Sequence, residues 1–87
     1  MKIKDGYKLR KMCGSSIVVA VGKASKEFNG MITLNETART MWLLLENGAE
    51  FDELTKALTD EYDVSDELAR EAAQSFIGKL TELEFLA

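Results

Sequence analysis

The side chains in this sequence that could take part in catalysis are mainly carboxylates, several of them in adjacent pairs. The pairs are Asp52-Glu53, Asp60-Glu61 and Asp66-Glu67. Two carboxylates that share a proton or hold a metal ion must converge on one point, whereas adjacent residues on a helix point in different directions. Each pair falls in a segment with helical periodicity. We therefore interpret the pairs as first-turn acids and solvated helix faces, and we expect no catalytic residues among them.

The remaining inventory narrows the chemistry further. The 87 residues include no histidine, no proline and one cysteine, Cys13. This composition excludes a Ser-His-Asp or Cys-His pair, a His/Cys zinc site and a disulfide within the sequence. We interpret Cys13 as a small, half-buried apolar residue near the end of a strand; a reactive thiol beside Lys11 is the alternative. The prediction is a protein that is not an enzyme and needs no metal or cofactor, with a small enzyme or cofactor carrier as the alternative.

Charge is distributed unevenly along the chain. Residues 1–30 hold seven cations against two acids, a balance of plus 5, and residues 31–87 hold four cations against thirteen acids, a balance of minus 9. The two parts therefore offer fields of opposite sign. One interpretation is that both are solvated faces that maintain solubility. The other is that the basic part helps to recruit an acidic partner.

Length and hydropathy indicate a single domain, residues 1–87, with one small core. The chain does not open on a charged segment followed by an apolar one, and its longest apolar run, Ile17 to Val21, is far too short to span a membrane. We expect a cytoplasmic protein in a reducing compartment, with no membrane partner.

The first third of the chain has the pattern of strands. Residues from Tyr7 to Cys13 alternate with period two, Gly14-Ser15-Ser16 supplies turn residues, and Ile17 to Val21 is apolar and rich in β-branched residues. Together these segments predict a hairpin. A polar segment then ends in Asn29-Gly30, a pair that suits a tight turn, and Met31 to Leu34 is predicted as a third strand.

The remainder predicts three helices. Asn35 is a good N-cap for the first, which Asn47-Gly48 ends through a left-handed C-cap. One apolar stripe on this helix is formed by Ala38, Met41, Trp42 and Leu45, so we expect Trp42 to be a core anchor rather than a ligand platform. The second helix, about Phe51 to Tyr62, begins weakly because Glu50 is a poor cap. The third is capped by Ser65 and runs to about Leu83.

The third helix has more apolar residues than one buried stripe requires. They are Leu68, Ala69, Ala72, Ala73, Phe76, Ile77, Leu80 and Leu83. The extra alanines either leave a shallow apolar strip that another backbone can approach, or they let helices of the same domain pack tightly. Strands followed by helices predict an α+β fold, with a three-stranded antiparallel sheet followed by three helices.

The sequence as a whole resembles the PqqD-like family. The similarity lies in the run FNGMITLNETARTMWLLLENG, then EFDELTKALTDEYDV, then a helix with Phe76-Ile77 and Leu80, and a terminal Phe85-Leu86. It covers about Tyr7 to Leu86, and its most specific part is Leu34-Asn35 followed at the family's spacing by Ala38, Trp42, Leu45 and Gly48. Members of this family are small winged helix-turn-helix-like domains. They are also called RiPP recognition elements, where RiPP stands for a ribosomally made, post-translationally modified peptide.

The resemblance implies a function. Family members are not enzymes; they bind the leader segment of a ribosomally made precursor peptide and present it to a modifying enzyme, often a radical SAM protein. The namesake acts in the biosynthesis of pyrroloquinoline quinone (PQQ). The leader adds as an antiparallel strand to the third strand and lies in the groove between that strand and the third helix. An exposed strand edge suits this mode, because its unpaired backbone groups can pair with an extended peptide.

Carried onto this chain, the resemblance predicts a peptide-binding site on two elements. The strand contributes the edge, and the third helix contributes the groove wall, with Phe76 and Leu80 favoured for the core. The predicted residues are Met31, Ile32, Thr33, Leu34, Ala69, Ala73, Phe76, Ile77 and Leu80.

The chain departs from the family pattern at three positions. Ala72 stands where an acidic residue is common, which makes the groove more apolar. Glu50 replaces the usual small polar cap of the second helix. Glu84 replaces a glycine near the end of the third helix, so we expect that helix to end without a left-handed cap.

Two further hypotheses follow from the same elements. A DNA-binding winged-helix regulator is the alternative function, but residues 65–84 carry two cations against five acids, and such a helix is repelled by phosphate. We therefore expect no nucleic acid partner. A bare strand edge also permits a homodimer, by edge pairing or by exchange of the N-terminal strands.

Overall fold

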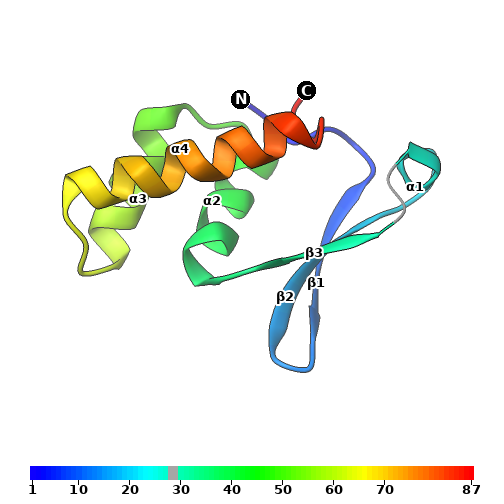
Figure 1. Cartoon of the computed structure of the whole chain (residues 1–87), viewed down its shortest axis with the longest axis horizontal. Coiled ribbons are helices and arrows are strands. Elements are labelled where there is room, and N and C mark those ends of the chain that lie inside the picture. Colours follow the sequence, from blue (N-terminus) through cyan, green and yellow to red (C-terminus); the bar gives the residue numbers. More distant parts are fainter. Residues whose placement is uncertain (28–29) are drawn as a thin grey trace.

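A computed structural model describes residues 1–27 and 30–87 and shows an antiparallel sheet that projects from a group of helices (Figure 1). The sheet has the order β1-β2-β3, with bounds β1 (Tyr7–Met12), β2 (Ser15–Ala20) and β3 (Met31–Leu34). The helices are α1 (Ala24–Glu27), α2 (Glu36–Glu46), α3 (Phe51–Glu61) and α4 (Asp66–Glu82). The predicted α+β fold is confirmed. The short helix α1 lies within the polar segment, for which no helix is predicted. The turn predicted at Asn29-Gly30 is not tested, because Asn29 lies outside the described residues.

The β1-β2 hairpin closes through a tighter turn than the sequence predicts. Met12 pairs with Ser15, so only Cys13 and Gly14 form the loop. Both have positive φ, 52° and 82°, as a type I′ turn requires, and this turn matches the right-handed twist of the strands. The predicted turn at Gly14-Ser15-Ser16 is therefore wrong, because both serines belong to β2. The predicted burial of Cys13 is wrong too, because the hairpin tip leaves this residue exposed.

Helix α2 follows β3 directly and forms as its sequence predicts. The Asn35 side chain caps it, since its Oδ1 accepts a hydrogen bond of 2.9 Å from the Ala38 amide. Gly48 has a φ of 90° and donates its amide to the Leu45 carbonyl at 3.2 Å. Both predicted ends of this helix are thus confirmed. Trp42 is fully buried and anchors the core, as expected.

Helices α3 and α4 begin and end through hydrogen bonds that the sequence only partly reveals. The Glu50 amide donates to the Glu53 carboxylate at 2.9 Å, which strengthens a start predicted to be weak. The Ser65 hydroxyl caps α4 by accepting from the Leu68 amide at 3.1 Å. At its far end, Glu84 has a φ of 61°.

This conformation of Glu84 overturns the expectation that α4 ends without a left-handed cap. The Glu84 amide donates to the Thr81 carbonyl at 3.1 Å, and the Phe85 amide donates to the Leu80 carbonyl at 2.9 Å. These two bonds form a Schellman motif, which needs a left-handed residue at the position of Glu84 whatever its side chain. Burial of the next residue explains why the motif forms here, since Phe85 is fully buried.

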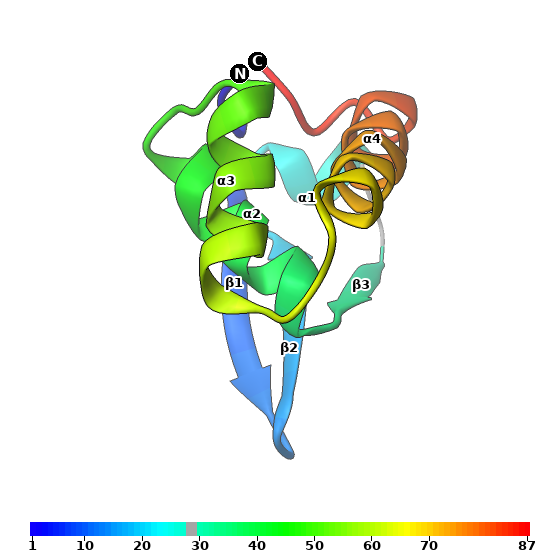
Figure 2. The ribbon, with the colours of Figure 1, turned by 90° about the vertical axis from the view of Figure 1, so that its left-hand side faces the viewer.

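Phe85 joins the two chain termini to the core. Its ring stacks on Tyr7 with centroids 4.1 Å apart and meets Trp42 edge-on at 6.3 Å. Backbone hydrogen bonds of 2.8 Å also join the first and last residues, from the Lys4 amide to the Phe85 carbonyl and from the Ala87 amide to the Lys2 carbonyl. The termini consequently lie side by side (Figures 1 and 2). No helix among the described residues is long and apolar enough to cross a membrane.

Candidate functional site

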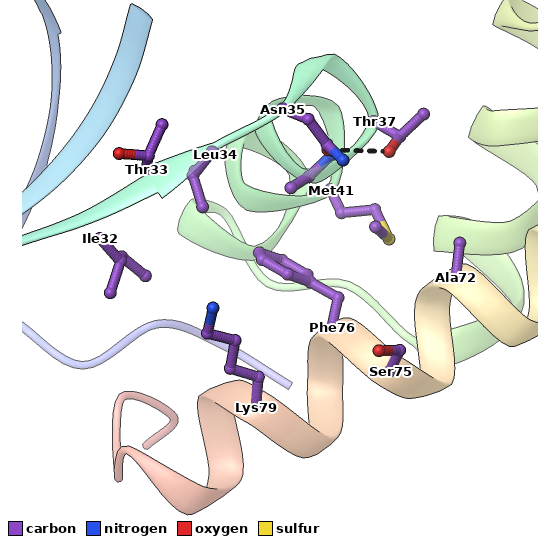
Figure 3. A pocket seen from close by; sticks show the side chains of 11 residues that line it. Ile32, Thr33, Leu34, Asn35, Thr37, Met41, Ala72, Ser75, Phe76 and Lys79 are labelled. Atoms are coloured by element: carbon purple, nitrogen blue, oxygen red, sulfur yellow. Dashed lines mark hydrogen bonds between the residues drawn. The ribbon is translucent and has the colours of Figure 1, made fainter.

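A groove of about 270 Å³ lies between β3, the first turns of α2, and α4. Figure 2 shows β3 and α4 on the same side of the molecule, and Figure 3 shows the side chains that face the groove. The lining residues are Ile32, Thr33, Leu34, Asn35, Thr37, Ala38, Met41, Ala72, Ser75, Phe76 and Lys79.

The Asn35 cap fixes the corner of this groove. Its Oδ1 accepts from the Ala38 amide and also from the Thr37 hydroxyl at 3.0 Å. These two bonds set the direction in which the chain leaves β3 and enters α2. As a result, the first turn of α2 closes one end of the groove, and its residues Thr37 and Ala38 line that end.

The groove has an apolar floor and a polar rim. Leu34, Met41 and Phe76 are 7%, 1% and 9% exposed, so these side chains also belong to the core. Ile32 is half-buried beside them. Such a floor can accept an apolar side chain. This side chain would be held by shape complementarity and hydrophobic burial rather than by charge.

The outer edge of β3 carries unpaired backbone groups at alternate residues. Gly6 accepts from the Val21 amide at 2.7 Å, and the two-residue turn makes Met12 and Ser15 a hydrogen-bonded pair. The backbone groups of successive residues in a strand point alternately to its two neighbours. Since Ser15 and Val21 direct theirs toward β1, Ser16 and Val18 direct theirs toward β3.

The partners of Ser16 and Val18 in β3 are Leu34 and Ile32, so these two residues use their amides and carbonyls within the sheet. Thr33 and Met31, the alternate residues, direct their amides and carbonyls away from β2. Among residues 1–27 and 30–87, no strand pairs with this side of β3. The free edge of β3 is therefore the backbone of Met31 and Thr33.

The two edges of the sheet differ in charge. The outer strand β1 has three cations in six residues, Lys8, Arg10 and Lys11, and all three are exposed. Cations on an edge strand discourage pairing with another chain. β3 has no charged residue. The sheet thus protects one edge and leaves the other open beside a groove with an apolar floor.

The structure brings only some of the predicted site residues to the groove. From β3, Ile32, Thr33 and Leu34 line it, while Met31 lies just beyond and is 61% exposed. Of the five residues predicted on α4, only Phe76 lines it.

The other four predicted α4 residues pack inward. Ala69, Ala73 and Leu80 are at most 1% exposed, and Ile77 is half-buried against the core. The prediction thus mixed residues from two faces of the helix, the face buried in the core and the face that lines the groove. Consequently the alanines at 69 and 73 let helices of this domain pack closely, which is the second of the two interpretations given for the small residues.

Sequence reasoning missed the groove stripe of α4. It consists of Ala72, Ser75, Phe76 and Lys79, at spacings i, i+3, i+4 and i+7. This is one face of a helix, but it contains a serine and a lysine and so does not stand out in hydropathy. Phe76 was among the predicted site residues, so the residues that share its helix face toward β3 could have identified this stripe. Ala72 lines the groove, consistent with the expectation that it makes the groove more apolar.

Among the described residues that line the groove there is no carboxylate, and Lys79 is the one charged residue. Arg70, the other cation of α4, lies outside the groove lining and pairs with Asp66 at 3.1 Å. The negative balance of residues 65–84 disfavours contact with phosphate. Among the described residues, no group of three or more carboxylate or cysteine side chains is placed to hold a metal ion.

Comparisons with known proteins place the fold. The solved structure of TbiB1 in complex with the TbiA(beta) leader peptide aligns over 99% of this chain and 94% of that chain, with a TM-score of 0.78 and 22% identity. Lasso peptide synthetase B1 complexed with the leader peptide aligns over 93% and 89%, with a TM-score of 0.73 and 18% identity. No curated protein sequence gives a significant match. The family model of coenzyme PQQ synthesis protein D (PqqD) matches residues 16–86. The chain belongs to the PqqD family.

Proposed function

We propose that this protein binds the leader segment of a ribosomally made precursor peptide by strand addition to β3. The observation that carries the proposal is the uncharged free edge of β3 beside a groove with an apolar floor. An extended peptide gains main-chain hydrogen bonds at such an edge, and alternate side chains enter the groove. Family membership and the two leader-peptide complexes of the same fold support this assignment.

In this proposal the domain acts as a recognition element and supplies no catalytic residue. A bound leader would hold the rest of the precursor close to a modifying enzyme, which the family resemblance suggests is a radical SAM protein, in the biosynthesis of PQQ or of another modified peptide. Short precursor and radical SAM genes beside the coding sequence would identify the reaction.

The basic first third of the chain suits a role in contacting that enzyme. Lys8 and Arg10 lie on the same outer face of the hairpin, because both belong to the residues of β1 that alternate with the core-facing Tyr7 and Leu9. Both are exposed. We propose that this face attracts an acidic surface on the modifying enzyme. Reversing the charges of both residues should therefore weaken binding between the two proteins.

The test of peptide binding is a titration of isotope-labelled protein with the leader half of a precursor encoded beside it. Amide resonances of residues 31–34 and of the α4 residues Ala72, Ser75, Phe76 and Lys79 should shift, and those of β1 should move little. Shifts that are absent from β3 and α4, or that are confined to the basic hairpin, would contradict the proposal.

A further inference from the structure

Lys79 is the only charged residue among the described residues that line the groove. It is exposed, and no ion pair of Lys79 is present in the described part of the chain, where the ion pairs involve the N-terminus, Lys56 and Arg70. Figure 3 shows its side chain rising from α4 toward β3, with its amine between Ile32 and Phe76. A cation in the last turn also stabilises the helix dipole, but that role does not require the side chain to cross the groove.

The groove therefore has two chemically different ends. Figure 3 shows Leu34, Met41 and Phe76 on the side of the groove toward the start of α2, whereas the Lys79 amine lies on the side of Phe76 that faces Ile32. Two strand residues separated by one position point to the same face. Leu34 and Ile32 are such a pair, so a strand added to β3 presents two side chains in succession to these two ends.

Strand direction fixes the order of those two side chains. In an antiparallel addition, like the other pairings of this sheet, the peptide residue opposite Leu34 comes first and the residue opposite Ile32 follows two positions later. The intervening residue lies opposite Thr33, where it exchanges backbone hydrogen bonds and points its side chain away from the groove.

We propose that Lys79 selects leaders in which an apolar residue is followed, two positions later, by aspartate or glutamate. This inference rests on the proposed function and specifies the peptide class that the groove accepts. The apolar side chain occupies the floor formed by Leu34, Met41 and Phe76, and the carboxylate pairs with the Lys79 ammonium ion. Because Lys79 is exposed, the pair should contribute only about 1.5- to 5-fold in affinity at low salt, and less as salt is added.

The test is a phage-displayed library of random dodecapeptides selected against the wild-type protein and three variants. Lys79→Met removes the charge and keeps a similar length, Lys79→Arg keeps the charge, and Lys23→Met is the matched control, because Lys23 is exposed and lies outside the groove lining. Peptides selected by the wild type, Lys79→Arg and Lys23→Met should be enriched in an acidic residue two positions after an apolar one. Lys79→Met should retain the apolar preference and lose the acidic one.

Individual peptides then test the order of the motif. A selected peptide should lose about 1.5- to 5-fold in affinity when its acid is replaced by the corresponding amide, and Lys79→Met should show no such loss. An acidic preference that persists in Lys79→Met would overturn the inference, as would selection of apolar residues without an acid. An acid placed two positions before the apolar residue would overturn the assigned strand direction. If no variant selects any peptide at β3, the proposed function itself fails, and this inference fails with it.

Discussion

Proline at position 33 should block leader binding while preserving the sheet. The Thr33 amide points to the free edge of β3, so Thr33→Pro removes no hydrogen bond between β2 and β3. A leader residue opposite Thr33 would exchange two backbone hydrogen bonds with it. Proline eliminates the first of these, and its ring occupies the space that the second requires. At about 0.5–1.5 kcal/mol for each bond, the loss is about 1–3 kcal/mol, or roughly 5- to 150-fold in Kd.

The same substitution at the other edge is the matched control. The Lys11 amide also points away from β2, by the same alternation, and Lys11 is exposed. Lys11→Pro should therefore disturb the backbone to a similar extent and leave Kd unchanged. Fluorescence anisotropy with a labelled leader gives Kd, and urea unfolding confirms that both variants fold.

Equal affinities for Thr33→Pro and the wild type would refute strand addition at β3, and equal losses in both variants would indicate a general effect of proline. Should Thr33→Pro fail to fold, N-methylation of single leader amides replaces it. Methyl groups on alternate amides should then weaken binding, and those on the intervening amides should not.

Three further predictions concern the groove, the end of α4 and self-association. Ala72→Leu should fill the groove and weaken leader binding by about 5- to 150-fold, with little change in stability. The neighbouring Ala73→Leu should instead destabilise the fold by about 1–3 kcal/mol, as measured by urea unfolding. The reverse pattern would contradict the assignment of the two helix faces. Glu84→Gly should raise the free energy of unfolding by about 0.5–1 kcal/mol, since it relieves the left-handed conformation of a residue with a side chain, and a decrease would argue against the Schellman motif. In the absence of leader, two copies of the protein should pair through the edge of β3. Light scattering over a concentration series should then show dimers, which added leader or the Thr33→Pro substitution dissociates. A monomer at every concentration would exclude this pairing.

Local sequence predicted the strand and helix that carry the free edge. Met31 to Leu34 and the Asn35 cap form continuous local signals, because a period-two strand and a side-chain cap each depend on residues close in sequence. Both features are confirmed, as are the core position of Trp42 and the left-handed Gly48.

Features that depend on distant residues were not predictable in the same way. Which face of α4 meets β3 depends on how the helix packs, and hydropathy alone favoured the buried alanines over Ser75 and Lys79. The left-handed Glu84 arises because Phe85 is buried between Tyr7 and Trp42, two residues far away in sequence. The turn at Cys13 follows from the register of the hairpin.

Amide hydrogen exchange at the edge of β3 tests the central claim most directly. The amides of Met31 and Thr33 point outward, and those of Ile32 and Leu34 already bond within the sheet. Saturation with leader should slow exchange at Met31 and Thr33 and leave the outward amide of Lys11 on β1 unchanged. Unchanged exchange at both β3 amides, with the leader demonstrably bound, would contradict strand addition.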